Sequence, residues 1–394
     1  MIHLLESPEP GECSTHGGGV FPVPECTNPV WPCALTGAVS FLAGFSDLAV
    51  VIHGSSGCYY YPKSLVKRPL HGSFILHDEV IFGTGARLRS VVSEVLEGGA
   101  GRVAVVNSCV PALMGEDLAS ELDDLPVLIV DSPGFLGDAE AGFTLAAETL
   151  LKEAEITATG VNLGGICLLD PFWRGNMHES KRILAMAGIP AGVILSHDQL
   201  KSLRNAAPMT VTANPDYTAP LGRSCGSLLG LSSLKQTLTD AADTIPGADP
   251  TPVLEECERA EEMVIAACEK YLRRNDPPVA ALCAQSGYAA FFAELLVRYL
   301  GSKQPLILPR NVTDTPGITD YDQIRSALSQ DAYDLVIGSS YEARILPDAA
   351  FIGITPPNRG HIMLGSRPLA GVEGTLHAVE LILNAVLDQK KKKG

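Results

Sequence analysis

The stretch Leu48-Ala49-Val50-Val51-Ile52-His53-Gly54-Ser55-Ser56-Gly57-Cys58 joins a short apolar run to a turn rich in Gly and Ser. Consecutive apolar and β-branched residues are typical of a parallel strand that is buried on both faces. In open parallel sheets, ligands bind beyond the carboxyl ends of the strands, and this turn lies at such an end. The stretch therefore predicts an α/β fold with a functional site directly after this strand.

Nine further apolar runs alternate with amphipathic segments along the chain. They cover residues 103–106, 127–130, 161–163, 192–195, 209–212, 279–283, 305–308, 335–337 and 351–354. Ten strands are accommodated more readily in three sheets than in a single sheet. We therefore expect three α/β domains with parallel sheets covered by helices. A Pro-rich junction precedes a helix predicted over 253–274, and a second boundary is expected near 157–160. The predicted domains are therefore 1–158, 159–250 and 251–394, the last with a C-terminal helix.

The composition excludes several classes of protein. The 394 residues carry a formal net charge of -16, which would repel a nucleic-acid backbone. No apolar stretch is long enough to span a bilayer, so we expect no membrane association and a cytoplasmic location. In that reducing compartment we do not expect the ten cysteines to form a disulfide framework. Each cysteine is then a core residue, a metal ligand or a reactive thiol.

Most of the cysteines have a structural explanation. Cys257 and Cys268 lie on the apolar stripe of the long helix predicted over 253–274. Cys283 lies inside an apolar run and Cys167 closely follows one, so small buried thiols explain both. Cys13 and Cys225 have no context that suggests chemistry.

Cys33, Cys58 and Cys109 differ because each lies in a turn or loop that can present a thiolate to a shared space. Helix N-termini and exposed backbone N–H groups stabilise thiolate and sulfide, as an iron–sulfur site requires. Cys26 is a fourth candidate. The chain has neither a CxxC motif nor a compact ferredoxin-type run of cysteines. The spacing of the cysteines alone is therefore also compatible with structural cysteines that bind no metal.

Four motifs in the same order resemble the cluster-binding half of nitrogenase component 1. They are Cys33 to Ala38, Val51 to Cys58, Asp78 to Gly83 and Cys109 to Asp117. Weaker similarity continues through 161–164, 179–188, 334–340 and 365–374, so the resemblance covers most of the chain from about Cys26 onward. It implies three Rossmann-like domains, and an iron–sulfur cluster of the four-iron type held by Cys33, Cys58 and Cys109 at a subunit interface.

The departures from nitrogenase bear on the substrate. An approximate alignment places Asn214 and Ala370 where nitrogenase anchors its large metal cofactor through Cys and His. Without a thiolate and an imidazole that cofactor has no anchor, so dinitrogen reduction is not expected. The pattern is nearer to relatives that reduce a bound tetrapyrrole, namely light-independent protochlorophyllide reductase and the nickel-sirohydrochlorin diamide reductive cyclase. The cyclase pattern lacks a match to Cys33, so the position within this group stays open.

The resemblance also implies partners. Three thiolates leave one position of a cubane to another residue or another chain, so a homodimer or a heterodimer with a related chain is expected. The sequence contains no Walker A motif. An ATP-dependent iron protein resembling nitrogenase reductase would therefore deliver the electrons, and the chain would be the catalytic component of a two-component reductase acting on an organic substrate.

A proton donor for such a reduction has four candidates, Glu116, Asp117, His53 and His77. Capping or ion pairing explains the two acids as well, and a hydrogen-bonded core position explains the histidines. The run Gly83-Thr84-Gly85 is similar to a phosphate loop, but a tight turn into a helix explains it without a ligand.

Two other classes of function remain. A scaffold on which a metal cluster is assembled and handed on would use the same cysteines. A plain α/β nucleotide- or sugar-binding protein with incidental cysteines would give a colourless preparation under strict anaerobiosis.

Overall fold

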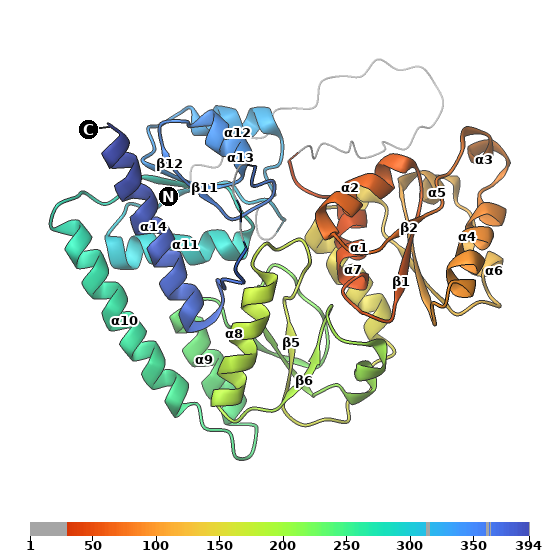
Figure 1. Cartoon of the computed structure of the whole chain (residues 1–394), viewed down its shortest axis with the longest axis horizontal. Helices are drawn as coiled ribbons and strands as arrows, with labels where there is room; N and C mark the ends of the chain where they lie inside the picture. Colours follow the sequence, from red (N-terminus) through yellow and green to blue (C-terminus); the bar gives the residue numbers. More distant parts are fainter. Residues whose placement is uncertain (1–29, 313–315, 360–361, 363, 394) are drawn as a thin grey trace.

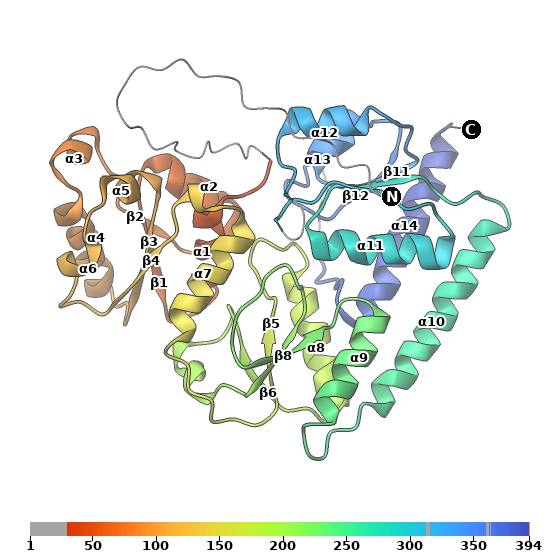
Figure 2. The ribbon, with the colours of Figure 1, turned by 180° about the vertical axis from the view of Figure 1, so that it is seen from behind.

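Figure 1 shows the computed structural model of the chain, which describes residues 30–312, 316–359, 362 and 364–393. Three blocks surround a common centre, and Figure 2 shows the same arrangement from behind. Each block contains a sheet of four strands, and every strand pair in these sheets is parallel. The predicted α/β class is confirmed.

The first block carries the amino-terminal half of the resemblance. Its sheet has the order β2 (His71–Gly72), β1 (Ala49–His53), β3 (Val103–Asn107) and β4 (Val127–Asp131). Its helices are α1 (Ala34–Leu42), α2 (Ser56–Val66), α3 (His77–Phe82), α4 (Gly85–Glu97), α5 (Cys109–Met114), α6 (Leu118–Glu121), η1 (Gly134–Leu136) and α7 (Ala139–Leu151). All five residues of β3 are buried, as expected of a central parallel strand.

The second and third blocks repeat this plan. The second sheet has the order β6 (Ala191–Ile194), β5 (Val161–Gly164), β7 (Met209–Thr212) and β8 (Arg223–Ser227), with helices α8 (Trp173–Met186), η2 (Leu200–Asn205) and α9 (Leu231–Ala242). The third has the order β10 (Leu306–Ile307), β9 (Ala280–Leu282), β11 (Leu335–Gly338) and β12 (Ala350–Gly353), with helices α10 (Thr251–Leu272), α11 (Ser286–Leu300), α12 (Tyr321–Leu328), α13 (Ser340–Ile345) and α14 (Gly371–Lys393). Each sheet falls within one predicted domain range, while the boundaries themselves stay a prediction.

All ten predicted strands are present, and two strands were missed. β2 has two residues, His71 and Gly72, and β8 reads Arg-Ser-Cys-Gly-Ser. Both lie at the edge of a sheet, where one side of the strand is unpaired and an apolar run is not required. The segment after Cys109 forms two short helices, α5 and α6, because Gly115 adopts a left-handed conformation with φ of 70° and ends α5.

The register of the first sheet gathers three loops at one edge. His53 pairs with Asn107, and Asn107 pairs with Asp131, so β1, β3 and β4 end side by side. The side chain of Asn107 donates a hydrogen bond to Asp131 Oδ1 at 2.9 Å. The loops that begin α2, α5 and η1 therefore start from the same edge.

Helices α1 and α7 approach each other more closely than side chains would allow. A Cβ atom on Gly37 would lie 1.7 Å from the carbonyl oxygen of Ala139, and one on Gly142 would lie 1.8 Å from that of Ala34. Only glycine fits at these two positions. The contact fixes the start of α1 beside η1, because Ala34 N donates to Gly137 O at 2.9 Å.

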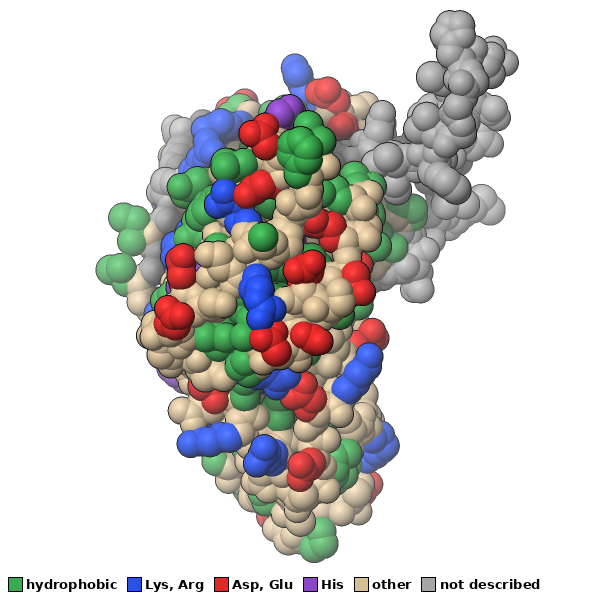
Figure 3. Space-filling view, turned by 90° about the vertical axis from the view of Figure 1, so that its right-hand side faces the viewer, with side chains coloured by type: hydrophobic (Ala, Val, Ile, Leu, Met, Phe, Trp, Pro, Cys, Tyr) green, Lys and Arg blue, Asp and Glu red, His purple; other side chains and the backbone are tan. Residues whose placement is uncertain are grey.

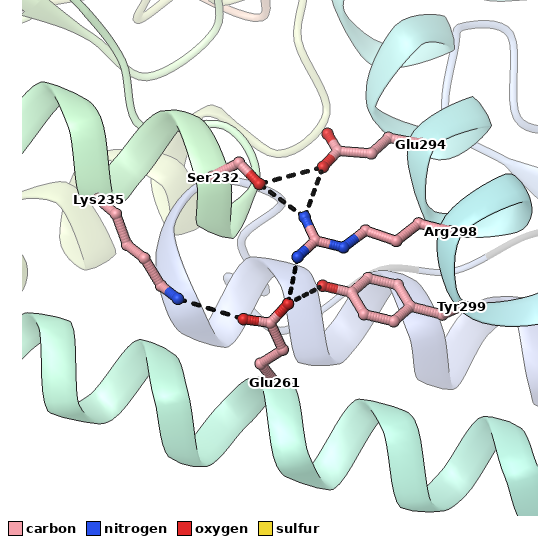
Figure 4. Close-up of polar contacts among 6 residues, drawn as sticks. All are labelled: Ser232, Lys235, Glu261, Glu294, Arg298 and Tyr299. Carbon is pink, nitrogen blue, oxygen red and sulfur yellow. Dashed lines mark hydrogen bonds and ion pairs between the residues drawn. The ribbon is translucent and has the colours of Figure 1, made fainter.

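A surface network joins the second block to the third (Figure 4). Glu261 of α10 accepts hydrogen bonds from Lys235 of α9 at 3.2 Å and from Tyr299 of α11 at 3.1 Å. Arg298 of α11 pairs with Glu261 and also donates to Ser232 at 2.8 Å. These charged contacts hold the long outer helix α10 against its neighbours.

The outer end of the first block shows acidic, basic and hydrophobic side chains intermingled (Figure 3). Among the described residues, no helix combines the length and apolar character needed to cross a bilayer.

Candidate functional site

Three cysteines lie where helices begin in the first block. Cys33 is the N-cap residue of α1, Cys58 lies in the first turn of α2, and Cys109 is the first residue of α5. We call Cys33, Cys58 and Cys109 the cysteine triad. All three are partly exposed, whereas the other five described cysteines are buried.

The structure brings the triad together around η1. A Cβ atom on Gly134 would lie 3.1 Å from Cys33 Sγ and 3.2 Å from Cys109 Sγ, so these two sulfurs are no further apart than the sum of those distances. The backbone N–H of Gly134 donates to Cys109 Sγ at 3.0 Å. Burial raises the pKa of Cys109, the N–H groups of Gly134 and Phe135 oppose this, and the charges of Cys58 and Cys33 raise that pKa further. All three thiols are thus within electrostatic range of one another.

Gly134 is a site residue that sequence reasoning missed. It follows Pro133 in the turn after β4, so the same strand-then-turn pattern that drew attention to Cys58 and Cys109 could have found it. A side chain at Gly134 would fill the space between two of the sulfurs.

The buried cysteines are unsuited to bind metal. Burial raises the pKa of Cys167 to about 12 and those of Cys257 and Cys268 to about 11. Their predicted core positions are confirmed, as is that of Cys283, which is fully buried. Cys26, the fourth candidate, lies outside the described residues.

The triad suits an iron–sulfur cluster better than a single ion. No group of three or more His, Cys, Asp and Glu side chains within the described ranges could hold one metal ion. A cluster binds each thiolate through a different iron atom, so its ligands stand further apart than those of a single ion. Soft thiolates with a backbone N–H donor match the chemistry of such a cluster. Two buried hydroxyls near the triad loops, those of Ser108 and Ser132, have no hydrogen-bond partner in the described structure.

His53 lies next to the triad but is enclosed. Its Nδ1 and Nε2 atoms lie 3.0 Å from Ser73 Oγ and 2.8 Å from Thr84 Oγ1. Burial lowers the pKa of His53 to about 4, although the charges of Glu116 and Glu79 act in the opposite direction. The imidazole is therefore neutral near pH 7 and makes the contacts of a hydrogen-bonded core residue.

Of the other three proton-donor candidates, only Glu116 is connected to His53. Glu116 accepts hydrogen bonds from the backbone N–H and the hydroxyl of Thr84, which connects it to His53. Asp117 caps α6 by accepting from Ser120 N at 3.2 Å, and His77 is exposed at the start of α3. The Glu116 contact also holds the turn Gly83-Thr84-Gly85 in place, which supports a tight turn there rather than a phosphate loop.

Large apolar side chains are exposed on the helices that carry the triad and on elements that neighbour them in the first block. We call this set the apolar rim, and its members are Tyr60, Tyr61, Phe74, Leu76, Val80, Ile81, Phe82, Leu113 and Leu136. They belong to α2, α3, α5, η1 and the segment before α3, and Phe82 is 86% exposed. The charge of Cys33 helps burial to raise the pKa of Tyr61, which places Tyr61 close to the triad. Exposed patches of this kind mark surfaces that a partner covers.

The junction of the three blocks has the opposite character. Asn214 is fully buried and donates from Nδ2 to Asp170 Oδ2 at 3.1 Å, and Tyr288 donates to the same oxygen at 2.6 Å. Ala370 is also fully buried, and its N–H donates to Asn176 Oδ1 at 2.9 Å. Asn176 in turn donates to Asp170 at 3.2 Å. The two positions aligned with the cofactor anchors of nitrogenase thus lie in one hydrogen-bonded core.

Comparison with known proteins identifies a family and several similar chains. Residues 33–234 match the family described as Nitrogenase component 1 type Oxidoreductase. Similar proteins include the nitrogenase iron-molybdenum cofactor biosynthesis protein NifE of Bradyrhizobium diazoefficiens (28% identical over 148 residues, 32% of this chain and 27% of that protein) and of Rippkaea orientalis (30% over 156 residues, 34% and 33%). The nitrogenase molybdenum-iron protein beta chain of Frankia alni is 26% identical over 196 residues, which are 43% of this chain and 37% of that one. The aligned regions thus span about a quarter to two fifths of these relatives.

The fold is shared over nearly the whole chain. The solved structure entitled "Nitrogenase Cp1 at pH 6.5" superposes with a TM-score of 0.81 at 16% identity, covering 98% of this chain and 97% of that one. Since the family match spans just over half of the 394 residues and includes the whole cysteine triad, this chain belongs to the nitrogenase component 1 type oxidoreductase family.

Proposed function

We propose that this chain is the catalytic component of a nitrogenase-like two-component reductase, with an iron–sulfur cluster of the four-iron type held by Cys33, Cys58 and Cys109. The observation that carries this proposal is the convergence of three partly exposed thiols from separate loops on one face. When bound, such a cluster supplies one-electron reduction. Holding the cluster and excluding water from it are then roles of this chain's own residues.

The surroundings of the triad suit this role. The N–H of Gly134 orients Cys109 and stabilises its thiolate form. The apolar rim would exclude water from the triad once a partner covers it. We propose a second related chain or a second copy as that partner, because three cysteines leave one cluster position unfilled. The cytoplasm is the compartment that suits exposed, reduced thiols.

Electron delivery is assigned to a separate ATP-dependent iron protein. The sequence has no Walker A motif, so nucleotide-driven reduction would be supplied in trans. The substrate would be a bound organic molecule, and a tetrapyrrole is one candidate class. The junction around Asn214 and Ala370 favours an organic substrate, because these two positions offer a large metal cofactor neither a thiolate nor an imidazole.

The similarity to NifE favours a second candidate, a scaffold for metallocluster assembly. It would use the same triad, so the two functions differ in what happens after the cluster is formed. A reductase turns over a substrate when the iron protein and ATP are supplied, whereas a scaffold transfers its cluster to an acceptor protein without turnover.

The test begins with iron content after anaerobic reconstitution. Cys33→Ser, Cys58→Ser and Cys109→Ser should each lose most of the bound iron, whereas Cys225→Ser should keep it. Cys225 is a matched control because it lies on edge strand β8 and is the least deeply buried of the other described cysteines. Unchanged iron in all three triad variants would refute the proposal.

The second stage separates the two functions. The reconstituted protein is mixed with an iron protein, ATP and a tetrapyrrole substrate, and the substrate spectrum is followed. Transfer of iron to an apo-acceptor without any spectral change would favour the scaffold.

A further inference from the structure

Two serines lie at the starts of the helices that carry Cys58 and Cys109. Ser55 is the N-cap residue of α2, and Ser108 is the N-cap residue of α5. A serine in this position usually accepts a hydrogen bond from a backbone N–H of the first helical turn. In the described structure neither side chain caps its helix. Both hydroxyls are therefore available for another role.

Ser339, at the start of α13, shows the ordinary arrangement. Its side chain caps the helix by accepting a hydrogen bond from Tyr341 N at 3.2 Å. In α5 the third residue is Pro111, which has no N–H to donate to a cap. One of the two N–H groups that an N-cap side chain ordinarily accepts is therefore missing for Ser108.

The Ser108 hydroxyl has no hydrogen-bond partner in the described structure, although the residue is fully buried. The neighbouring backbone groups of Gly54 are already engaged. The N–H of Gly54 donates to Ser73 Oγ at 3.0 Å, and its carbonyl oxygen accepts from Ile75 N at 3.0 Å. A buried polar group without a partner costs free energy, so native proteins rarely contain one. A partner from outside the chain would remove this cost.

The Ser108 side chain reaches the loop that carries Cys58. A Cβ atom on Gly54 would lie 2.0 Å from Ser108 Oγ and 3.5 Å from Cys58 Cβ. Only glycine at this position allows the hydroxyl such a close approach. The backbone of Ser108 is fixed by His53, whose carbonyl oxygen accepts from Ser108 N at 3.0 Å. Because Ser108 directly precedes Cys109, its hydroxyl lies between two of the loops that bear the triad.

Ser55 approaches the triad within the loop of Cys58. Its Oγ atom donates a hydrogen bond to Cys58 Sγ at 3.6 Å. Cys109 Sγ accepts from the N–H of Gly134 at 3.0 Å. Two sulfurs of the triad thus each have a hydrogen-bond donor, and the Ser108 hydroxyl is a further, unused donor beside them.

We propose that the hydroxyls of Ser55 and Ser108 donate hydrogen bonds to the sulfur atoms of a cluster bound by the triad and thereby raise its reduction potential. This inference rests on the cluster of the proposed function. Reduction adds one negative charge to an iron–sulfur cluster, and donors directed at its sulfur atoms stabilise that charge. The two serines are positioning residues that bind no iron themselves.

The first measurement is the midpoint potential of the full chain after anaerobic reconstitution. Ser108→Ala and Ser55→Ala should each keep their iron. Each should disfavour one-electron reduction roughly tenfold, which lowers the potential by about 59 mV. Ser55→Thr retains a hydroxyl and should retain the potential. Ser339→Ala is the matched control, because it removes a buried N-cap serine from the third block, and it should leave the potential unchanged.

Resonance Raman spectra in H₂O and D₂O give a readout that a purely structural role would not change. Deuterium exchange should shift the iron–sulfur bands of the unaltered protein, because the exchanged hydrogens are bonded to sulfur. The shift should be smaller in Ser108→Ala and Ser55→Ala and complete in Ser55→Thr. Part of it should remain in every variant, since the N–H of Gly134 is still present.

Urea unfolding before reconstitution tests the Ser108 hydroxyl without the cluster. Ser108→Ala should leave the urea midpoint unchanged or raise it, because it removes a buried hydroxyl that has no partner. Ser339→Ala should lower the midpoint, because it removes the cap of α13. An equal loss in both variants would show that Ser108 is already satisfied in the cluster-free protein, and it would overturn the proposal.

The remaining outcomes separate this inference from the proposed function. Full iron content with unchanged potentials and unchanged deuterium shifts in both alanine variants contradicts the inference alone. Loss of iron from Ser108→Ala also contradicts it, because the hydroxyl would then be a ligand. An unaltered protein that holds no iron after reconstitution contradicts the proposed function itself.

Discussion

Two regions of the molecule differ in exposure and in hydrogen bonding: the face that carries the cysteine triad, and the junction of the three blocks. At the triad, partly exposed thiols and the apolar rim face outward. At the junction, Asp170, Asn176 and Asn214 are buried and bonded to one another. The difference teaches that the first block gathers soft thiols at its surface, whereas the junction is a packed polar core whose hydrogen-bonding groups bond one another.

The largest effect on stability is expected at the junction. Asp170→Ala should lower the free energy of unfolding by about 3 to 5 kcal/mol, because it leaves Tyr288, Asn176 and Asn214 without their shared acceptor. Urea unfolding measures this loss. Asp170→Asn keeps one acceptor oxygen and removes a buried charge, so it should cost much less. Equal losses in both variants would show that the hydrogen bonds do not hold the junction closed.

A glycine substitution should damage the triad without touching a sulfur. Gly37→Ala should cost about 3 kcal/mol or more, since its Cβ would collide with the carbonyl oxygen of Ala139 and push α1 away from α7. Cys33 would move with α1, so bound iron should fall as well. Gly57→Ala is the control, because a Cβ there meets only the Ser55 hydroxyl at 3.9 Å. Full iron content in a folded Gly37→Ala protein would contradict the placement of Cys33.

Asp216, whose N–H bonds Asn214 of the junction, should also give the protein a pH dependence at mildly acidic pH. Burial raises the pKa of Asp216 to about 6, although hydrogen bonds from Gly287 and Asn311 oppose the shift. A carboxyl whose pKa is raised by folding favours the folded state while it is protonated. Its contribution is therefore lost as pH rises from about 4 through 6, by up to about 3 kcal/mol. Unfolding measured across this range should show a smaller decline for Asp216→Asn than for the unaltered protein.

The smallest effect concerns the surface network of α10. Glu261→Gln should cost about 1 kcal/mol, because it weakens the contacts with Lys235 and Arg298 in a partly solvated setting. Glu255→Gln on the same helix should cost almost nothing, since the Glu255 pair with Arg259 is exposed and 3.9 Å long. Thermal unfolding distinguishes the two, and a larger loss at Glu255 would contradict the role of Glu261.

The sequence was sufficient to predict the buried strands and the loops that bear the triad. Apolar runs report burial on both faces, so all ten predicted strands are present, whereas the polar edge strands β2 and β8 carried no such signal. The position of Cys109 after β3 followed from the same logic. The end of α5 at Gly115 could not be predicted in this way, because a glycine is compatible both with the interior of a helix and with its end.

Hydrogen bonds between side chains of distant segments could not be predicted. The absence of cofactor anchors at Asn214 and Ala370 was visible in the sequence, but the partners Asp170 and Asn176 come from other elements. Likewise His53 and Glu116 were both candidates, and only the fold shows that Thr84 links them. Such hydrogen bonds depend on how the blocks pack, which local patterns do not encode.

The most direct measurement is diffraction from an anaerobically grown crystal at the iron absorption edge. The account predicts anomalous density within bonding distance of the Sγ atoms of Cys33, Cys58 and Cys109, on the face bordered by the apolar rim. Iron bound elsewhere in the molecule, or a reconstituted crystal without iron at these three sulfurs, would contradict it.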